Sequence, residues 1–234
     1  MKHVKYPTGG PKVAVDCIIF GFSGTELNLL LIHRGFEPGK GLWSLVGGFV
    51  QDTEDLDQAP RRVLKNLTGL DDIYLEQVHV FGDIHRDPGG RVISVAYFAL
   101  IRKDLQDDAL ILKHNARWFP VHELPDLVFD HRDMVTFALN QLILKTRIQP
   151  VGFNLLPEKF TLPELQALYE AIYGRSLDDR NFRRRILSLG ILKKLDEKQK
   201  GNSKKGAFLY RFDRKAYDGL KGEMAKVNSL LTIF

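Results

Sequence analysis

Residues 48–70 read GFVQDTEDLDQAPRRVLKNLTGL, and no other stretch of the chain is as informative. Its second half carries apolar residues at helical spacing: Ala59, Val63, Leu64 and Leu67. Gly69 is suited to end this helix, because glycine adopts the left-handed conformation without strain. Pro60 is tolerated only in the first turn of a helix, which favours Asp57 over Asp55 as the capping residue. The stretch therefore predicts an acidic loop followed by a short amphipathic helix.

Strand-like runs surround this stretch. They occupy residues 13–22, 26–34, 74–85, 91–101 and 113–119, and most are β-branched or Leu-rich and bounded by turn residues. The first two are separated by a Gly-Ser-Gly turn region, which suggests a hairpin. A helical stretch is expected from Glu123 to residue 148. Pro150 and Gly152 then interrupt the chain, so we expect one domain over residues 1–149 and a second over residues 150–234.

The composition excludes several classes of protein. The chain has 234 residues, of which 44% are hydrophobic and 27% charged, so it can form a buried core and is not disordered. Cys17 is the single cysteine, which excludes an internal disulfide and a multi-cysteine zinc site, and its apolar surroundings predict a buried thiol. No apolar run is long enough to span a membrane, and the N-terminus does not resemble a signal peptide. We expect a cytoplasmic protein.

The net charge of +5 is unevenly distributed along the chain. Residues 150–234 contain 17 Lys or Arg and 10 Asp or Glu, a net charge of +7, which leaves −2 for residues 1–149. A weakly acidic body is therefore joined to a basic C-terminal third, as expected of a protein with an anionic partner at that end.

The C-terminal third has the order of a winged helix-turn-helix. Thr161 and Glu164 have the spacing of a capping box that begins one helix, and Gly174 is suited to end it. Asp178 or Asp179 then starts a second helix whose core positions are Phe182, Ile186 and Leu189. Two short strands, at residues 191–197 and 207–213, flank a basic loop. Helix, turn, helix and hairpin in this order predict a recognition helix and a wing.

The recognition helix and the wing carry the candidate DNA-binding residues. Arginine can bond guanine in a bidentate manner, asparagine can do the same with adenine, and lysines can neutralise phosphates. The candidates are Arg180, Asn181, Arg183 and Arg184 on the helix, with Lys200, Ser203, Lys204 and Lys205 in the wing loop. The predicted partner is a double-stranded DNA operator.

Residues 48–70 resemble the Nudix box, G-x5-E-x7-R-E-U-x-E-E-x-G-U, where U is a bulky aliphatic residue. The positions that match are Gly48, Glu54, Arg62, Leu64, Gly69 and Leu70. The three glutamates of the R-E-U-x-E-E core are replaced by Val63, Asn66 and Leu67. In the family those carboxylates gather the magnesium ions that pyrophosphate cleavage requires, and Val and Leu cannot ligate a metal. The resemblance thus implies a Nudix fold without hydrolysis, catalytic residues, a metal or another cofactor.

The surviving box residues are expected to have structural roles. Glu54 and Arg62 are predicted to form an ion pair between the loop and the helix. Asp52, Asp55 and Asp57 could bind a metal with some other geometry, but a solvated acidic loop before a helix is the favoured interpretation. A domain of this kind can retain its pocket as a sensor. Candidate effector-binding residues are His33, Arg34, Ser44, Phe49, Asp83, His85, Arg86 and Arg91.

With both motifs, the chain resembles the Nudix-related transcriptional regulators over nearly its whole length. The resemblance is carried by LWSLVGGFV (residues 42–50), by FDH (129–131), by FTLPELQ (160–166) and by FRRR (182–185). It implies an α+β protein, in which an N-terminal Nudix-like α/β/α sandwich with a mixed sheet precedes a winged helix-turn-helix. It also implies a homodimer that acts as a repressor on a pseudo-palindromic operator. A divergent Nudix hydrolase and an RNA- or protein-binding adaptor are the alternatives.

The resemblance leaves two small-molecule effectors open. One branch of the family controls NAD biosynthesis and responds to ADP-ribose, and another controls sugar use and responds to L-arabinose. The details of CIIFGF (residues 17–22), HRGFEPGKGLWSL (33–45) and residues 151–175 favour the arabinose branch.

Overall fold

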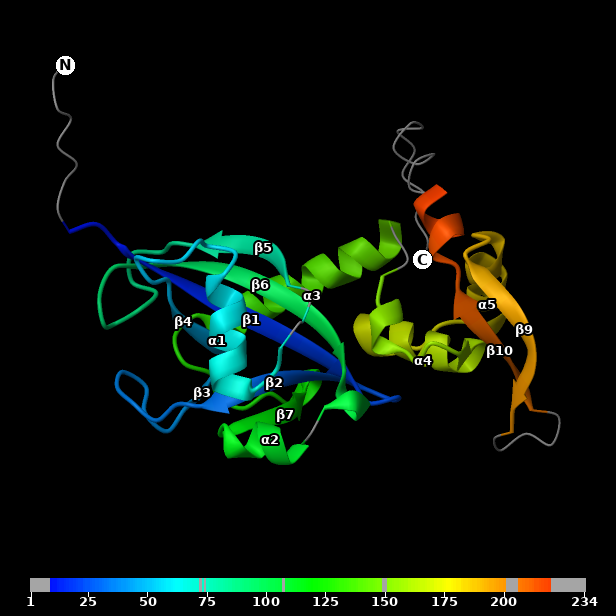
Figure 1. Ribbon diagram of the computed structural model, residues 1–234, viewed down its shortest axis with the longest axis horizontal. Coiled ribbons are helices and arrows are strands. Elements are labelled where there is room, and N and C mark those ends of the chain that lie inside the picture. The colour runs from blue at the N-terminus through cyan, green and yellow to red at the C-terminus, as the bar shows by residue number, and fades with distance from the viewer. Residues whose placement is uncertain are drawn as a thin grey trace, which may run out of the picture. The chain divides into compact units, whose positions relative to one another are not determined.

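The computed structural model describes residues 9–71, 73, 75–106, 108–148, 151–200 and 206–219 (Figure 1). By its contacts the chain divides into two compact units. One comprises residues up to Ile19, Leu29–Ala99 and Asp107–Ala138, and the other comprises Phe20–Asn28, Leu100–Gln106 and the chain from Leu139 onward. The predicted boundary falls between residues 149 and 150, which lie outside the described residues, and stays a prediction.

A seven-stranded sheet forms the N-terminal part of the fold. The strands are β1 (Lys12–Phe22), β2 (Leu27–His33), β3 (Trp43–Ser44), β4 (Val46–Phe49), β5 (Glu76–Phe81), β6 (Val92–Arg102) and β7 (Ala116–Pro120). Their order is β3-β2-β1-β6-β5, with β4 paired to β1 and β7 paired to β2. The two long strands of the sheet, β1 and β6, are almost entirely buried because apolar residues fill both of their faces. The predicted strand runs are confirmed within a few residues.

The box helix is α1 (Ala59–Thr68), which packs against β4. Pro60 lies at its start and Gly69 ends it with a left-handed φ of 74°, as the sequence predicts. The predicted cap was wrong, however, because Gln58 is the N-cap and makes no side-chain cap bond. Asp57 instead accepts a hydrogen bond of 3.3 Å from the hydroxyl of Tyr97.

Two further helices complete this part of the fold. In Figure 1, α1 lies in front of the sheet and the beginning of α3 (His131–Ile148) lies behind it. The ring of Phe137 in α3 stacks on His79 of β5, with 4.5 Å between the ring centroids. The predicted helix start at Glu123 was wrong, because Val121–Glu123 form only a 3-10 turn and Phe129 has a positive φ of 52°. A helix that was not predicted, α2 (Asp108–Lys113), lies just before the last strand of the sheet.

The C-terminal elements form a winged helix. A 3-10 turn (Phe153–Leu155) leads into β8 (Phe160–Thr161), α4 (Leu162–Tyr173), α5 (Asp179–Ser188), β9 (Leu192–Gln199) and β10 (Ala207–Phe212). These three strands form a sheet in the order β8-β10-β9. The capping box of Thr161 and Glu164 is confirmed with both of its hydrogen bonds, and Asp178 caps α5.

The core of the winged helix is formed by the apolar faces of α4 and α5. The fully buried side chains include Leu165, Leu168, Tyr169 and Ile186, and Phe182 is only 2% exposed. Leu189 was expected on the same face but is only half-buried, because α5 ends at Ser188. The buried face leaves the charged side of α5 exposed to solvent.

Candidate functional site

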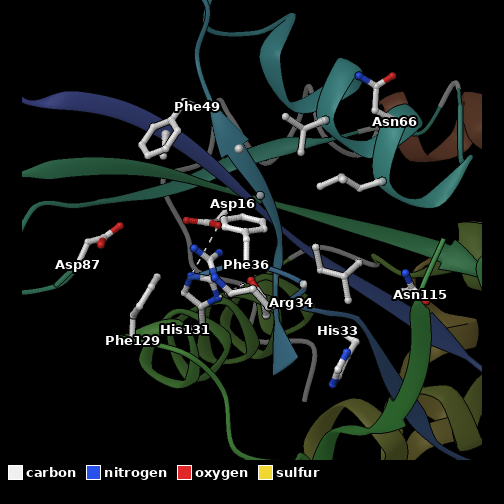
Figure 2. Close-up of a pocket in the computed structure, with 18 of the residues that line it drawn as sticks. Asp16, His33, Arg34, Phe36, Phe49, Asn66, Asp87, Asn115, Phe129 and His131 are labelled. Carbon is white, nitrogen blue, oxygen red and sulfur yellow. Dashed lines mark hydrogen bonds and ion pairs between the residues drawn. The ribbon is translucent and has the colours of Figure 1, made fainter. Parts of the chain in front are cut away.

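A pocket of about 460 Å³ opens beside the box helix (Figure 2). Asp16 and His131 face each other at the centre of the view, with Phe36 in front of them. His33 and Asn115 lie on one side of the view, and Phe129 and Asp87 on the other. The lining therefore comes from segments that are far apart in the sequence, and its volume is within the range of pockets that hold small ligands.

Five of the eight predicted effector residues line this pocket: His33, Arg34, Ser44, Phe49 and Arg86. The other three, Asp83, His85 and Arg91, do not belong to its lining. Asp83 and Arg91 instead bond the backbone of their own loop. Asp83 accepts a hydrogen bond of 2.7 Å from the backbone of His85, and Arg91 donates to the carbonyls of Gly82 and Asp83. The role of these three residues in effector binding stays a prediction.

Glu54 and Arg62 form the predicted ion pair. Arg62 donates from Nε and Nη2 to the two carboxylate oxygens, at 2.7 and 2.5 Å, and also bonds the carbonyl of Phe49. Glu54 also accepts from the backbone of Gln51, and its side chain is 10% exposed. The hydrogen bonds from Arg62 lower the pKa of Glu54 to about 2. The pair therefore joins the acidic loop to α1.

The three residues at the positions of the missing glutamates all line the pocket. Val63 is buried, Leu67 is half-buried and Asn66 is exposed. Gly48 also lines the pocket, and a side chain at this position would come within 3.0 Å of Val63. Where the box of a hydrolase presents carboxylates, this wall presents two apolar side chains and one neutral amide.

A charged cluster contributes Asp16 and Arg86 to the lining. Arg86 donates two hydrogen bonds of 2.8 Å to Asp130, and its side chain is 3% exposed. Asp16 accepts a hydrogen bond of 2.5 Å from Ser94 and lies 3.7 Å from the Arg86 guanidinium. Both carboxylates thus share one buried cation, which is the arrangement that buried charges require.

His131 is a further buried polar group of the lining. Its Nδ1 accepts a hydrogen bond of 3.1 Å from the backbone N–H of Leu45, and its Nε2 lies 3.8 Å from Asp16. Burial lowers the pKa of His131, although Asp16 and Asp130 oppose this effect. The imidazole is thus disposed to stay neutral.

Gly47 makes room for this cluster. The pairing of β1 with β4 places Gly47 directly opposite Asp16. A Cβ atom on Gly47 would lie only 2.0 Å from Oδ1 of Asp16. A glycine is therefore required here for the Asp16 carboxylate to occupy its place.

An aromatic wall completes the pocket. The guanidinium of Arg34 lies over the ring of Phe36, at 4.0 Å from the centroid, and 5.3 Å from that of Phe129. Its Nε donates to the carbonyl of Pro38 at 2.6 Å. Phe36 and Phe49 are 63% and 50% exposed, so both offer apolar surface to a ligand.

Seven polar or aromatic lining residues were missed as candidates: Asp16, Phe36, Asp87, His114, Asn115, Phe129 and His131. Asp16 carried a signal, because a carboxylate inside an apolar strand must be paired when it is buried. The FDH segment also contained Phe129 and His131. The remaining residues belong to loops or element ends that only the tertiary fold brings together.

The predicted DNA-binding residues of the recognition helix all lie on its exposed side. Arg180, Asn181, Arg183 and Arg184 are exposed, and Nη2 of Arg184 donates a hydrogen bond of 3.1 Å to the side chain of Asn181. Lys200 is exposed after β9. Ser203, Lys204 and Lys205 lie outside the described residues.

Neither a cluster of metal-ligating side chains nor a membrane-spanning helix is present in the described part of the chain. No group of three or more His, Cys, Asp or Glu side chains there could hold a metal ion. No helix among the same residues is long and apolar enough to cross a membrane.

Two family descriptions match the chain. Residues 10–137 match the NUDIX domain, and residues 152–212 match the NrtR DNA-binding winged helix domain. An α/β NUDIX domain with a mixed sheet, followed by a winged helix, is the fold class predicted from the sequence, and it is confirmed.

The chain is similar to two curated relatives. It is 38% identical to the "ADPR responsive transcriptional repressor NtrR" of Acinetobacter baylyi, over 91% of this chain and 86% of the relative. It is 37% identical to an ADP-ribose pyrophosphatase of Methanocaldococcus jannaschii, over 53% of this chain and 71% of that enzyme. The first match extends over both domains, whereas the second covers only about half of the chain.

Solved structures from Shewanella oneidensis are also similar. NrtR in complex with a 27mer DNA has a TM-score of 0.77 and 31% identity, over 88% of this chain and 95% of that one. The NUDIX domain of NrtR in complex with ADP-ribose has a TM-score of 0.52 and 30% identity, over 58% of this chain and 94% of that one. None of these matches supports the expected preference for the arabinose branch. The chain belongs to the NrtR family of transcriptional regulators, in which a NUDIX domain precedes a DNA-binding winged helix domain.

Proposed function

We propose that this protein is a transcriptional repressor that binds ADP-ribose in the NUDIX pocket without hydrolysing it. In this proposal the winged helix binds operator DNA, the protein acts as a homodimer, and ADP-ribose changes its affinity for the operator. The Acinetobacter relative, which is described as an ADP-ribose-responsive repressor, supports the regulatory role. The Shewanella structures with DNA and with ADP-ribose support the two ligands.

The single observation that carries the proposal is the pocket wall formed by Val63, Asn66 and Leu67. Cleavage of a pyrophosphate by a Nudix enzyme needs hard oxygen ligands to hold magnesium against adjacent phosphates. At these positions the wall offers only one neutral oxygen, that of Asn66. A nucleotide can therefore be held here while the reaction lacks its metal ligands.

The rest of the pocket has groups that suit ADP-ribose. Arg34 can bond a phosphate, because its guanidinium has further N–H donors besides the one bonded to Pro38. Phe36 and Phe49 can pack against a base. Asp87 can accept hydrogen bonds from sugar hydroxyls.

Hydrolysis is the second candidate function, and the pyrophosphatase relative favours it. Glu54 remains from the box, but both of its oxygens accept hydrogen bonds from Arg62. Incubation with ADP-ribose and Mg²⁺, followed by chromatography, should yield no AMP above a blank without protein. Release of AMP at an enzymatic rate would establish the hydrolase and refute the non-hydrolytic proposal.

Ligand binding can be tested by thermal shift and calorimetry with ADP-ribose, AMP and L-arabinose. We expect stabilisation by ADP-ribose and none by L-arabinose. The variant Arg34→Ala should weaken this binding, whereas Arg61→Ala, which removes an exposed arginine of α1 outside the pocket lining, should not. Stabilisation by L-arabinose alone would overturn the choice of effector and leave the regulatory role in place.

DNA binding can be tested by selecting a binding site from a pool of random duplexes. The selected duplex should contain a pseudo-palindrome, and light scattering should give the mass of a dimer. In gel-shift assays, addition of ADP-ribose should change the fraction of bound duplex. Failure to enrich any sequence would refute the repressor function.

A further inference from the structure

A groove of about 330 Å³ lies between the recognition helix and the wing hairpin. Arg183 of α5 forms one wall, and Gly206, Ala207, Phe208 and Tyr210 form the other, with Leu162 and Pro163 of α4 also in the lining. Arg183 is exposed, so the groove has a cation on the side of the recognition helix.

Two lysines that are not part of the groove lining lie over the ring of Phe208, which is part of it. Nζ of Lys194 lies 3.7 Å from the centroid of the Phe208 ring, and Nζ of Lys198 lies 4.5 Å from it. In the hairpin Lys198 is opposite Phe208 and Lys194 is opposite Tyr210, and the register shifts between these two positions. Two flexible lysines are thereby held beside one ring by cation–π attraction.

Phe208 is 38% exposed, so its ring is accessible beside the two lysines. Two ammonium groups beside one ring also repel each other. An anion bound between them would relieve this repulsion, and the ring would keep both groups in position to receive it.

The nearby acidic residues of β9 do not remove the charge of both lysines. Glu197 is bound by Lys159, which bonds both of its oxygens at 2.8 and 2.7 Å. Asp196 is exposed between the two lysines in the sequence. Arg183 in the groove lining and the two lysines beside Phe208 are thus three cations near one carboxylate, that of Asp196.

We propose that this groove receives one sugar–phosphate strand of duplex DNA, and that Phe208 is a positioning residue which holds Lys194 and Lys198 against its phosphates. This inference rests on the proposed DNA-binding function and adds to it a site outside the wing loop. The contacts carry no sequence information, because phosphates are the same at every step of the duplex.

The test compares variants on the selected duplex and on an unrelated duplex at several salt concentrations. Lys194→Ala/Lys198→Ala should weaken binding to both duplexes, and should reduce the slope of log K against log salt by about 2, since each phosphate contact contributes roughly 0.9. Phe208→Leu retains both charges but removes the ring, and should weaken binding about 2- to 5-fold. The matched control is Lys193→Ala, on the same strand and opposite Arg211, which should leave the affinity near that of the wild type.

A second measurement separates a phosphate contact from a structural effect. Single phosphates of the duplex can be replaced by neutral methylphosphonates. Replacements that weaken binding of the wild-type protein at the phosphates near the groove should not weaken binding of Lys194→Ala/Lys198→Ala any further. The groove assignment is overturned if this variant responds to salt and to the neutral phosphates as Lys193→Ala does. If the wild type binds neither duplex, the DNA-binding function itself fails, and the groove assignment fails with it.

Discussion

In the NUDIX domain, Arg62 and Arg86 are each held by a carboxylate in a two-bond pair, whereas in the winged helix Arg180, Arg183 and Arg184 extend from α5 into solvent. For Arg86, whose side chain is 3% exposed, the difference follows from burial. A guanidinium that loses its water must be paired, while an exposed one can keep its donors for a partner. The same residue type thus stabilises one domain and is available for recognition in the other.

The comparison predicts the largest effect for Arg86→Ala. Removal of this side chain leaves Asp130 and Asp16 without their buried cation, and should cost about 3–5 kcal/mol of unfolding free energy. Urea denaturation measures this loss. Arg61→Ala, which removes an exposed arginine from α1, should change the stability little. Equal stability of the two variants would mean that the buried pairs do not hold the domain together.

A smaller effect, on operator affinity and not on stability, is expected for Arg183→Ala and Arg184→Ala. Each should cost roughly 1–3 kcal/mol of operator affinity without changing the unfolding midpoint. The reason is that both side chains lie on the exposed face of α5. Arg214→Ala, a change of the same charge after β10, serves as the control in the same gel-shift series. Unchanged affinity would remove the substituted arginine from the contact surface.

The smallest effect concerns the pair of Glu54 and Arg62. Because the pKa of Glu54 is lowered from 4.5 to about 2 in the folded protein, its ionised form stabilises the fold above about pH 4.5, and this contribution is lost as the pH falls towards 2. Glu54→Gln should therefore melt at a lower temperature than the wild type at pH 6. The difference in melting temperature between the variant and the wild type should become smaller as the pH falls. A difference that is constant with pH would contradict the assigned role of the carboxylate.

The sequence predicted those features that depend on local patterns. The capping box of Thr161 and Glu164 and the end of α1 at Gly69 involve residues within one turn of each other, so their spacing is sufficient evidence. The ion pair of Glu54 and Arg62 spans only eight residues and was predicted because both positions survive in the box. The exposed side of α5 was predicted from the helical spacing of its apolar residues.

The pocket was predicted only in part, because tertiary pairing determines its lining. Asp16 reaches the site through the register of β1 with β4, and His131 reaches it because α3 begins eight residues later than Glu123 suggested. Asp83 and Arg91 had suitable chemistry, but their side chains bond the backbone of their own loop. Residue type alone does not show whether a side chain lines the pocket or bonds the backbone of its own loop.

The hydrogen bond from Leu45 to Nδ1 of His131 has a further consequence. A nitrogen that accepts a hydrogen bond carries no proton, so the neutral ring must be the Nε2–H tautomer. Protonation of Nδ1 would place its N–H against the N–H of Leu45. This would break the hydrogen bond between His131 and the backbone beside β3 and β4. The Nε2–H of His131 is therefore the end of the ring that faces Asp16, at 3.8 Å from Oδ1.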